Sequence, residues 1–417
     1  MAITNGSSPG GALAGVRVLD ATQMLAGPLC AMRLGDLGAD VIKIENPGSG
    51  EFNRTHGFED LTVGEEMTTF LALNRNKRDA AINLKSPEGR QALLDLARSS
   101  DVFIQNFRVG TAERLGVGYD DLCAVNPGIV YCTISGYGPA GPYRDRPGQD
   151  LVMQGYSGSM LSVGAIGDPP IPGALWAGDV MSGYQAAIGI LAALTERRSS
   201  GLGQRVDVDM FSVVLDAQAQ ELVTYLNTGR APTRTAERSA HASIPAPYGV
   251  YRTADGWLTL AMCPLPSLGE ALDDDVLRGL TAYNDGHTHK DMVYARIREA
   301  FVGRSTAEWI ELLDRHGVWC GPVYDYHDLV RDPHVIDVGM VTTQPDDRVG
   351  TIRTIRPPVQ LSRTPTAITR GAPTLGADTV DVLTEVAGYT EERIAALLRS
   401  GAVAAAEPRQ LTSEEAA

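Results

Sequence analysis

Asp179 stands where a carboxylate could act as a nucleophile, directly after Gly178 and before the long apolar segment 180–198. A segment of that composition is typical of a buried helix, so Asp179 would lie at its N-terminus. There the helix dipole keeps a carboxylate ionised, and Gly178 leaves room for a substrate to approach, as covalent catalysis requires. The same position suits an N-cap, which is the commoner role of an aspartate at a helix start. Position alone does not separate the two roles.

Basic side chains gather in a few loops of an otherwise acidic chain. They lie in the segment 73–78 and at Arg108, Arg114, Arg144 and Arg146, several of them after a predicted strand. Arginine binds phosphate through paired hydrogen bonds, and ligands of open α/β sheets gather at strand ends. Solvated loop charges are the alternative for each of these residues. The seven histidines are scattered, so the pattern predicts no metal site, and no G-x-S-x-G elbow indicates an α/β-hydrolase.

The elements that must position these residues alternate between strands and helices. We predict strands at 16–21, 40–45, 79–84, 101–107, 129–134 and 205–210, and helices that end near Leu37 or cover 86–99 and 180–198. Nearly continuous apolar strands separated by helices indicate a parallel sheet covered on both faces, in a Rossmann-like α/β domain. The G-x-G-x-x-G fingerprint does not follow the first strand, so we expect no NAD.

The character of the sequence changes past Thr228. Polar loops precede a predicted hairpin within 248–262, with Asp255-Gly256 as its turn, and helices at 290–301 and 306–315. We therefore predict a disordered tail at 1–14, a large Rossmann-like domain at 15–224, a small α+β domain at 225–330, a return to the large domain at 331–403 and a flexible tail at 404–417.

Composition excludes several classes of partner. The 417 residues carry a net charge of −15, which argues against nucleic acid or an anionic membrane as the main ligand. No apolar run approaches the ~18 residues of a membrane span, and the polar N-terminus is unlike a signal peptide. The five cysteines have no C-x-x-C spacing and are interpreted as reduced core residues. The sequence thus predicts a soluble cytoplasmic protein.

Taken together, several segments resemble the class III coenzyme A transferases, the family of formyl-CoA transferase and the carnitine CoA-transferases. The resemblance runs from Gly15 to Ala402 and is specific through its combination of segments in order. These are GVRVLDATQMLAGP, LGDLGADVIKIENPGSGE, LNRNKRDAAINLKSPEGR, DVFIQNFRVGTAERLGVGYDDL, NPGIVYCTISGYGPAGPY, ALWAGDVMSGYQAAIGILAAL and SGLGQRVDVDM, followed later by GVWCGPVYDYHDLVRDPHV.

This resemblance implies a CoA-binding large domain built from both chain ends, a small middle domain, and an interlocked homodimer. It places the family's catalytic aspartate at Asp179, with acyl-CoA and a small carboxylic acid as substrates and no metal. The positions that would contact CoA are Ala26, Leu73, Arg75, Asn106, Phe107, Arg114, Leu115 and Arg146.

The sequence departs from its relatives at three places. Asn46 stands where relatives often have an arginine for the nucleotide phosphate, and Leu25 stands where formyl-CoA transferase has a glutamine beside the acyl group. The glycine-rich flap of the oxalate-acting members has no counterpart in the segment Ile244–Pro264. The last two differences weaken an oxalate or formate assignment and leave the acids open.

The racemases of the same family are the nearest alternative. They remove a proton alpha to the thioester with the histidine of a G-H-D stretch, which here reads Gly148-Gln149-Asp150. A glutamine amide does not titrate in the usable range and cannot be a general base. We therefore expect Asp179 to form a mixed anhydride and then an aspartyl-CoA thioester, with Gln149 and backbone N–H groups near Asp179 stabilising the oxyanions.

Two other functions remain open from the sequence. One is an acyl-CoA racemase or epimerase that uses a base other than histidine. The other is a non-catalytic acyl-CoA binder or a structural subunit of a heteromeric transferase, which the intact Asp179 disfavours.

Overall fold

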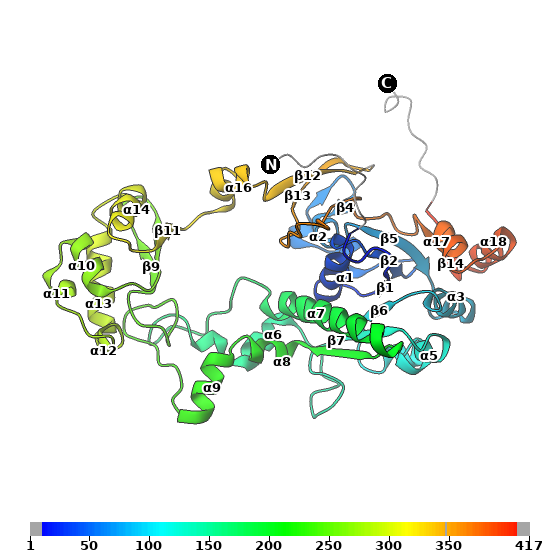
Figure 1. The fold of residues 1–417 in the computed structure, drawn as a ribbon, viewed down its shortest axis with the longest axis horizontal. Helices are drawn as coiled ribbons and strands as arrows, with labels where there is room; N and C mark the ends of the chain where they lie inside the picture. Colours follow the sequence, from blue (N-terminus) through cyan, green and yellow to red (C-terminus); the bar gives the residue numbers. More distant parts are fainter. Residues whose placement is uncertain (1–10, 347, 407–417) are drawn as a thin grey trace, which may run out of the picture. The chain divides into compact units, whose positions relative to one another are not determined.

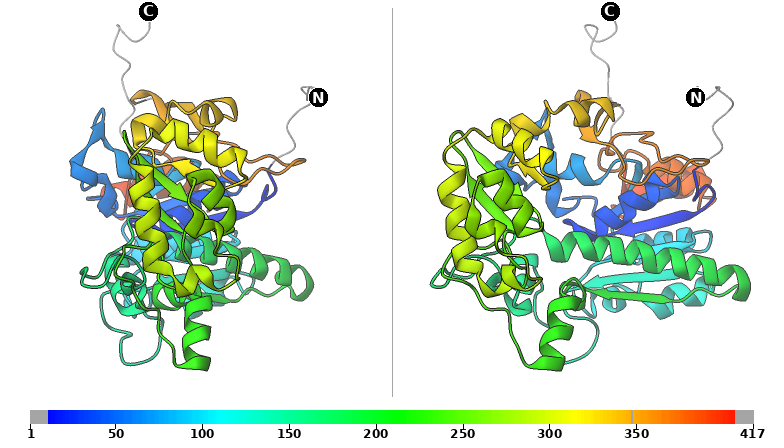
Figure 2. Two further views of the ribbon diagram at one scale, coloured as in Figure 1. Left: turned by 90° about the vertical axis from the view of Figure 1, so that its left-hand side faces the viewer. Right: turned by 60° about the vertical axis from the view of Figure 1, so that its left-hand side comes forward.

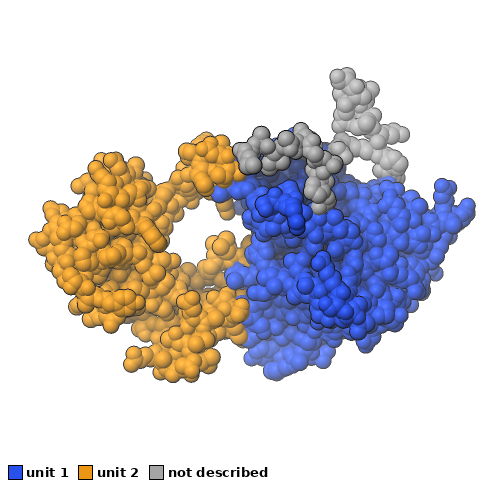
Figure 3. Space-filling model, viewed as in Figure 1, with its two compact units in different colours: residues 1–150, 177–213, 339–417 blue, residues 151–176, 214–338 orange. Residues whose placement is uncertain are grey.

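The computed structural model describes residues 11–346 and 348–406, which form two compact units. The first unit contains the chain up to Asp150, residues 177–213 and the chain from Gly339 on; the second contains 151–176 and 214–338 (Figure 3). The predicted tails lie mostly outside the described residues. Of their described parts, Leu13 donates its backbone N–H to the carbonyl of Leu37 at 2.9 Å, and Ala404 belongs to a strand.

A sheet of seven strands forms the centre of the first unit (Figure 1). In spatial order these are β14 (Val403–Ala404), β5 (Lys77–Ile82), β2 (Asp40–Glu45), β1 (Arg17–Ala21), β6 (Val102–Gln105), β7 (Val130–Ser135) and β8 (Arg205–Asp209). Only β14 is antiparallel to its neighbour; the six others run parallel. Their order is that of a doubly wound α/β fold, with the switch point between β1 and β6. The predicted parallel-dominated α/β sheet is therefore confirmed.

Side chains of the parallel strands alternate between two hydrophobic cores, one on each face of the sheet. Leu19 and Phe103 belong to one core, and their neighbours Val18 and Val102 belong to the other. Helices α1 (Ala26–Asp36) and α7 (Ala177–Ser200) cover the second face and contact each other. The first face is covered by α3 (Pro87–Ala97), α5 (Tyr119–Val125), α17 (Thr379–Glu385) and α18 (Glu391–Ser400).

Several bounds differ from the sequence prediction. Strand β5 begins at Lys77, earlier than the predicted 79, because the buried Lys77 side chain pairs with Asp20 and extends the strand through a charged segment. Helix α7 begins at Ala177, so Asp179 lies in its first turn and not before it. Strand β14 and the hairpin β12 (Val341–Asp346) and β13 (Gly350–Ile355) were not predicted. The shorter elements of this unit are η1 (Phe52–Arg54), η2 (Phe58–Asp60), β3 (Thr62–Val63), β4 (Glu66–Met67), α2 (Thr68–Leu73) and α4 (Thr111–Leu115).

The second unit has its own core around a small antiparallel sheet (Figure 2). Its strands are β9 (Gly249–Arg252), β10 (Trp257–Leu260) and β11 (Cys320–Pro322), so the predicted hairpin exists with β11 added beside it. Tyr251, Phe301 and Trp309 are among the buried residues of this core. Its helices are α9 (Ala219–Thr228), α10 (Leu265–Leu272), α11 (Asp275–Arg278), α12 (Asp285–Thr288), α13 (Lys290–Phe301), α14 (Thr306–Arg315), α15 (Tyr326–Leu329) and α16 (Pro333–Asp337), with η3 (Ser159–Leu161). Helices α6 (Asp150–Ser157) and α8 (Met210–Asp216) cross the boundary between the units.

Cysteines and possible metal ligands show no special grouping. All five cysteines are free; Cys30 and Cys132 are buried, whereas the other three are half-buried and so not fully in the cores. In the described part of the chain, no group of three His, Cys, Asp or Glu residues could hold a metal ion. No helix there is long and apolar enough to cross a membrane.

Candidate active site

The carboxyl ends of β1 and β6 meet at the switch point of the sheet, where Ala21 pairs with Gln105. The two following loops are joined by a reciprocal pair of hydrogen bonds. Gln23 donates its backbone N–H to Asn106 Oδ1 at 3.0 Å, and Asn106 Nδ2 donates to the carbonyl of Gln23 at 2.8 Å. Because ligands of doubly wound sheets bind at this crevice, the predicted position Asn106 lies where a ligand is expected.

Buried charges beneath the β1 loop hold it in place. Lys77 Nζ lies 2.9 Å from Asp20 Oδ2, and both side chains are fully buried. Burial disfavours the charged form of Asp20, but Lys77 and Lys43 outweigh it and lower the pKa of this carboxyl. Lys43 Nζ in turn donates to the carbonyl of Thr22 at 3.0 Å.

Met24 sits in the same loop with a φ of 70°, in the left-handed region that costs a non-glycine residue about 1 kcal/mol. Its backbone N–H donates to Glu51 Oε2 at 2.9 Å, and its carbonyl accepts from Asn53 Nδ2 at 2.7 Å. Both partners follow β2, so side chains from the neighbouring strand's loop stabilise this conformation. Helix α1 then begins at the buried Ala26, another predicted contact.

Glycine allows two close approaches at this helix start. A Cβ on Gly27 would lie 2.3 Å from Cβ of Thr22, and a Cβ on Gly183 would lie 2.7 Å from the carbonyl oxygen of Ala26. Gly183 is one turn along α7 from Asp179, so the first turn of α1 lies beside the second turn of α7. Helix α7 ends shortly before β8, and it therefore runs antiparallel to the strands and starts at their carboxyl edge. The fold thus gathers Ala26, Asn106 and Asp179 at one edge of the sheet.

Asp150 supplies the cap that the sequence assigned to Asp179. Its Oδ1 accepts the backbone N–H of Gly178 at 2.6 Å and that of Asp179 at 3.3 Å. These are the donors that an N-cap side chain normally takes. Asp150 is 1% exposed, whereas Asp179 is half-buried in the first turn of α7. The N-cap interpretation of Asp179 is therefore wrong: its carboxylate is not needed to close the helix.

The pKa of Asp179 is higher than its place at a helix N-terminus predicts. Burial, and secondly the charge of Asp150, raise the pKa of Asp179 from 3.8 to about 6. A helix N-terminus by itself would lower the pKa of a carboxyl, so desolvation is the larger effect. Near pH 7 most Asp179 carboxyls remain ionised, as expected from the sequence, but the pKa lies only about one pH unit below neutrality.

Arg75 has an environment different from that of an exposed phosphate ligand. Arg75 is 3% exposed, and its guanidinium donates to Asp36 Oδ1 and Oδ2 at 2.9 and 2.8 Å and to the carbonyl of Ile355 at 2.6 Å. The preceding Asn74 donates from Nδ2 to Glu51 Oε1 at 3.3 Å, which connects the segment after Leu73 to the β1 loop. The Arg75 side chain thus fastens this segment to α1 and β13.

The other predicted residues differ in exposure. Phe107 and Leu115 are half-buried and pack against the first core, whereas Arg114, Arg146 and Gln149 are exposed. Arg114 donates to Thr111 Oγ1 at 2.7 Å, and the Arg146 guanidinium lies 4.2 Å from the Tyr143 ring centre. Asn46 Oδ1 accepts the N–H of Gly48 at 2.9 Å within its own turn. No described contact joins these exposed residues to Asp179.

Sequence reasoning missed Asp150, Glu51 and Lys43 as parts of this site, and it took Lys77 in the segment 73–78 for a candidate phosphate ligand, whereas Lys77 pairs with the buried Asp20. Asp150 is 28 residues from Gly178, so no local pattern relates the two. The signal for the lysines was their presence inside apolar strands, because a lysine at such a position needs a buried partner. Lys43 in Val41–Ile44 is the clearest example.

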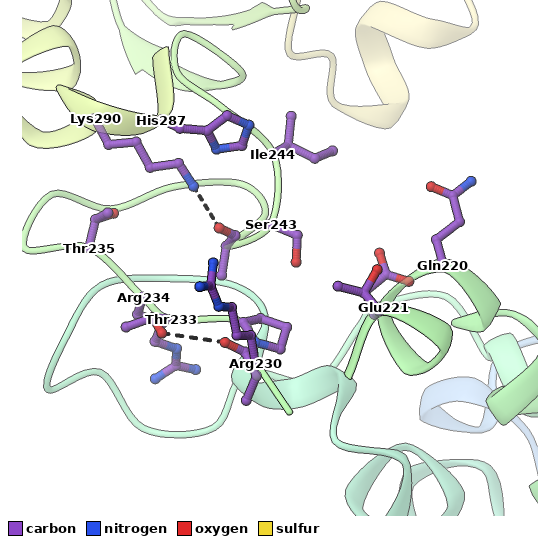
Figure 4. Close-up of a pocket in the computed structure, with 14 residues that line it drawn as sticks. Gln220, Glu221, Arg230, Thr233, Arg234, Thr235, Ser243, Ile244, His287 and Lys290 are labelled. Carbon is purple, nitrogen blue, oxygen red and sulfur yellow. Dashed lines mark hydrogen bonds between the residues drawn. The ribbon is translucent and has the colours of Figure 1, made fainter. Parts of the chain in front are cut away.

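The second unit holds a cavity of about 690 Å³ beside α9, lined among others by Arg230, Arg234 and Lys290 (Figure 4). Two of its cations are occupied by backbone carbonyls: Lys290 Nζ donates to Ala242 at 2.6 Å, and Arg234 Nη1 donates to Asp168 at 2.6 Å. None of the predicted site residues lines it.

Comparison with known proteins agrees with this architecture. The family model of CoA-transferase family III matches residues 13–379. The human succinyl-CoA:glutarate CoA-transferase is 34% identical over 94% of this chain and 90% of that protein. A formyl-CoA:oxalate CoA-transferase of Rhodopseudomonas palustris is 29% identical over 97% and 99% of the two chains.

Solved structures give the same result. A CAIB/BAIF family protein from Brucella suis superimposes with a TM-score of 0.79 at 28% identity, over 91% of this chain and all of the other. The chain belongs to CoA-transferase family III, and the resemblance inferred from its sequence is confirmed.

Proposed function

Starting from this family membership, we propose that the protein moves CoA from an acyl-CoA to a free carboxylic acid through covalent intermediates on Asp179. One observation carries the proposal. Asp179 lies at the start of α7 beside α1, and Asp150 occupies the backbone donors that Asp179 would otherwise cap. A half-buried carboxylate that is ionised at neutral pH and has no structural duty suits a nucleophile.

The chemistry has four balanced steps. A carboxylate oxygen of Asp179 attacks the thioester carbonyl, the C–S bond breaks, and CoA leaves as thiolate beside a mixed anhydride. The thiolate attacks the Asp179 carbonyl and releases the donor acid as carboxylate. The acceptor carboxylate attacks the resulting aspartyl thioester and again releases thiolate, which finally takes the new acyl group and restores Asp179. The thioester energy is thus kept in covalent bonds throughout.

CoA would lie along the carboxyl edge of the sheet. The first turn of α1 at Ala26 offers backbone N–H groups to a phosphate, and Asn106 and Phe107 flank the switch point. Arg114, Leu115 and Arg146 are the further contacts we propose, and Arg114 and Arg146 are exposed. Because Asp36 holds the Arg75 guanidinium, the segment with Leu73 and Arg75 would contribute its backbone.

The acids are proposed to be short dicarboxylic acids. Glutarate and oxalate, which the names of the two relatives contain, both carry a second carboxylate. The departures at Leu25 and in Ile244–Pro264 disfavour oxalate. A panel of succinyl-CoA with glutarate, malate, oxalate and monocarboxylic acids of equal length tests this assignment, and equal rates with the monocarboxylic acids contradict it.

An interlocked homodimer is part of the proposal. Met181, Tyr184 and Ile188 follow one another along α7 and are 37%, 38% and 59% exposed, an apolar stripe that a second chain would cover. Light scattering of the purified protein should give twice the chain mass of 44.5 kDa.

Asp179→Ala tests the nucleophile directly. We expect loss of transfer activity and, in the wild type incubated with acyl-CoA and hydroxylamine, a hydroxamate at Asp179 that mass spectrometry detects. Asp145→Ala, which removes an exposed carboxylate nearby in sequence, is the control and should keep full activity. Activity of Asp179→Ala within a few-fold of wild type would refute the proposal.

The same preparation distinguishes the alternatives. Deuterium exchange at the alpha carbon without an acceptor acid would indicate a racemase or epimerase. Inactivity of the protein alone with every acid of the panel would favour a non-catalytic acyl-CoA binder or a subunit of a heteromeric enzyme.

A further inference from the structure

The cap of helix α7 comes from outside the helix. An N-terminal helix turn has backbone N–H groups without partners, and a side chain at the preceding position usually accepts them. Here Trp176 precedes the helix and has no carboxylate or hydroxyl. Asp150 Oδ1 takes the N–H groups of Gly178 and Asp179 instead, at 2.6 and 3.3 Å. A buried carboxylate at the start of α6 therefore closes the start of α7.

This arrangement leaves the Asp179 carboxylate unoccupied. Among the described residues, its side chain accepts no hydrogen bond and forms no ion pair, although it lies in a helix turn where a capping role would be ordinary. The same contacts fix the backbone of Asp179, because its N–H is bound to Asp150. Asp150 thus sets the position of the carboxylate without holding its oxygens.

The two carboxylates are also close enough to interact through their charges. Burial and then Asp150 raise the pKa of Asp179 to about 6, and no other described charge contributes resolvably. The nearby first turn of α1 carries no acidic residue, and Arg33 in its last turn stacks on Tyr184 further along α7.

Acylation changes this balance. When Asp179 attacks a thioester, its negative charge passes to the departing thiolate, and Asp179 becomes a neutral anhydride and later a neutral thioester. Repulsion from Asp150 is then relieved. An interaction that is unfavourable before the reaction and absent after it lowers the barrier between the two states.

We infer that Asp150 is a positioning residue for Asp179: it caps α7 in place of the nucleophile, and its charge favours the neutral, acylated form of Asp179. This inference rests on the proposed function. It assigns to Asp150 two separable actions, one that needs only an acceptor oxygen and one that needs a negative charge.

Three variants separate these actions. Asp150→Asn keeps an acceptor oxygen and removes the charge, and Asp150→Ser does the same with a shorter side chain; Asp150→Ala removes both. Asp332→Asn is the matched control, because Asp332 is the N-cap of α16 and also accepts two backbone N–H groups, at 2.8 and 3.1 Å, far from Asp179 in sequence. The measurements are kcat/KM for CoA transfer between pH 5 and 9, melting temperature, and the rate of hydroxylamine trapping.

The wild type should lose kcat/KM below a pH of about 6, as Asp179 becomes protonated. In Asp150→Asn this acidic limb should move to lower pH by about half a unit or more, because the negative charge that raises the pKa of Asp179 is gone. Hydroxylamine trapping at pH 8 should slow about three- to tenfold, because a less basic carboxylate is a weaker nucleophile. Asp150→Ala adds a fall in melting temperature. Asp332→Asn leaves the pH profile unchanged.

Three results would overturn the inference. The first is that Asp150→Asn has its acidic limb at the same pH as the wild type and is trapped by hydroxylamine at the same rate. If Asp150→Asn fails to fold, Asp150→Ser serves for this comparison. The second is a wild-type limb near pH 4, which needs no variant. The third is an identical loss in Asp150→Asn and Asp150→Ala, which would make the residue merely structural. Failure of the proposed function is distinguished by Asp179→Ala, which then stays active whatever Asp150 does.

Discussion

Replacing Asp179 by asparagine should make the protein more stable while it abolishes transfer. Burial, with Asp150 in second place, raises the pKa of Asp179 from 3.8 to about 6, so the folded protein disfavours its charge. A raised pKa contributes stability that is complete below 3.8 and is lost as the pH rises through 6. Asparagine is neutral at every pH and keeps that stability.

The magnitude follows from the two pKa values. The interval from 3.8 to about 6 corresponds to about 3 kcal/mol, at ~1.4 kcal/mol for each pH unit. Asp179 is partly exposed, so solvent screening reduces this to about 1–2 kcal/mol. At about 2–4 °C per kcal/mol for a unit of this size, Asp179→Asn should melt about 2–8 °C above the wild type at pH 8. About half of the difference should remain at pH 5, because that pH lies midway between the two values.

Differential scanning calorimetry of both proteins at pH 8 and pH 5 measures this difference. Asp332→Asn is the control, since the hydrogen bond from Tyr324 and the capped N–H groups lower the pKa of Asp332, and its loss should not raise the melting temperature at pH 8. Loss of a helix cap would lower the melting temperature. If Asp179→Asn melts below the wild type at pH 8, the assignment of the cap to Asp150 is therefore refuted. A gain that is equal at both pH values would refute the electrostatic cause.

Three further predictions concern the surroundings of the site. Lys77→Met removes the lysine that pairs with the buried Asp20 and should destabilise the first unit by about 3–5 kcal/mol. The melting temperature should fall strongly, and adding Asp20→Asn to Lys77→Met should restore part of it. Arg75→Ala should lower the melting temperature but change KM for acyl-CoA by less than about threefold, since Asp36 holds its guanidinium; a large rise in KM alone would make it a ligand contact. Gln149→Ala should lower kcat by about 100-fold with little change in KM if its amide binds an oxyanion, measured by steady-state kinetics.

The sheet was largely predictable from sequence because its strands are buried on both faces. Val16–Ala21 and Asp40–Glu45 are rich in aliphatic residues, and the bounds of β1 and β2 agree with them within a residue. Strand β14 pairs Val403 with Ile82 from the opposite end of the chain, and so short a segment has no periodicity of its own. The strands β12 and β13 are rich in polar residues, and β13 is mostly exposed, so they lack the apolar alternation that marks a strand.

The position of Asp179 was predictable, but its relation to Asp150 was not. Its place beside an apolar helix is a local feature, whereas the bonds from Gly178 and Asp179 to Asp150 join segments that only the fold brings together. The same applies to Arg75: its sequence setting suggests a free cation, whereas the structure pairs it with Asp36 of helix α1, 39 residues away. The sequence shows which charged groups are present, but pairing between residues far apart in the chain decides which of them can still bind a ligand.

The occupied backbone donors also restrict where the oxyanions of the reaction can bind. The sequence suggested backbone N–H groups near Asp179 for this purpose, but those of Gly178 and Asp179 are taken by Asp150. A donor that is already bonded to a buried carboxylate is not free to bind a developing oxyanion, because its hydrogen bond to Asp150 would have to break first. The helix start therefore provides position, and not electrostatic stabilisation, to the reaction. That stabilisation must come from side chains such as the exposed amide of Gln149, which directly precedes Asp150 in the chain. Residues 149 and 150 would then divide the work between them, one binding the oxyanion and the other setting the nucleophile.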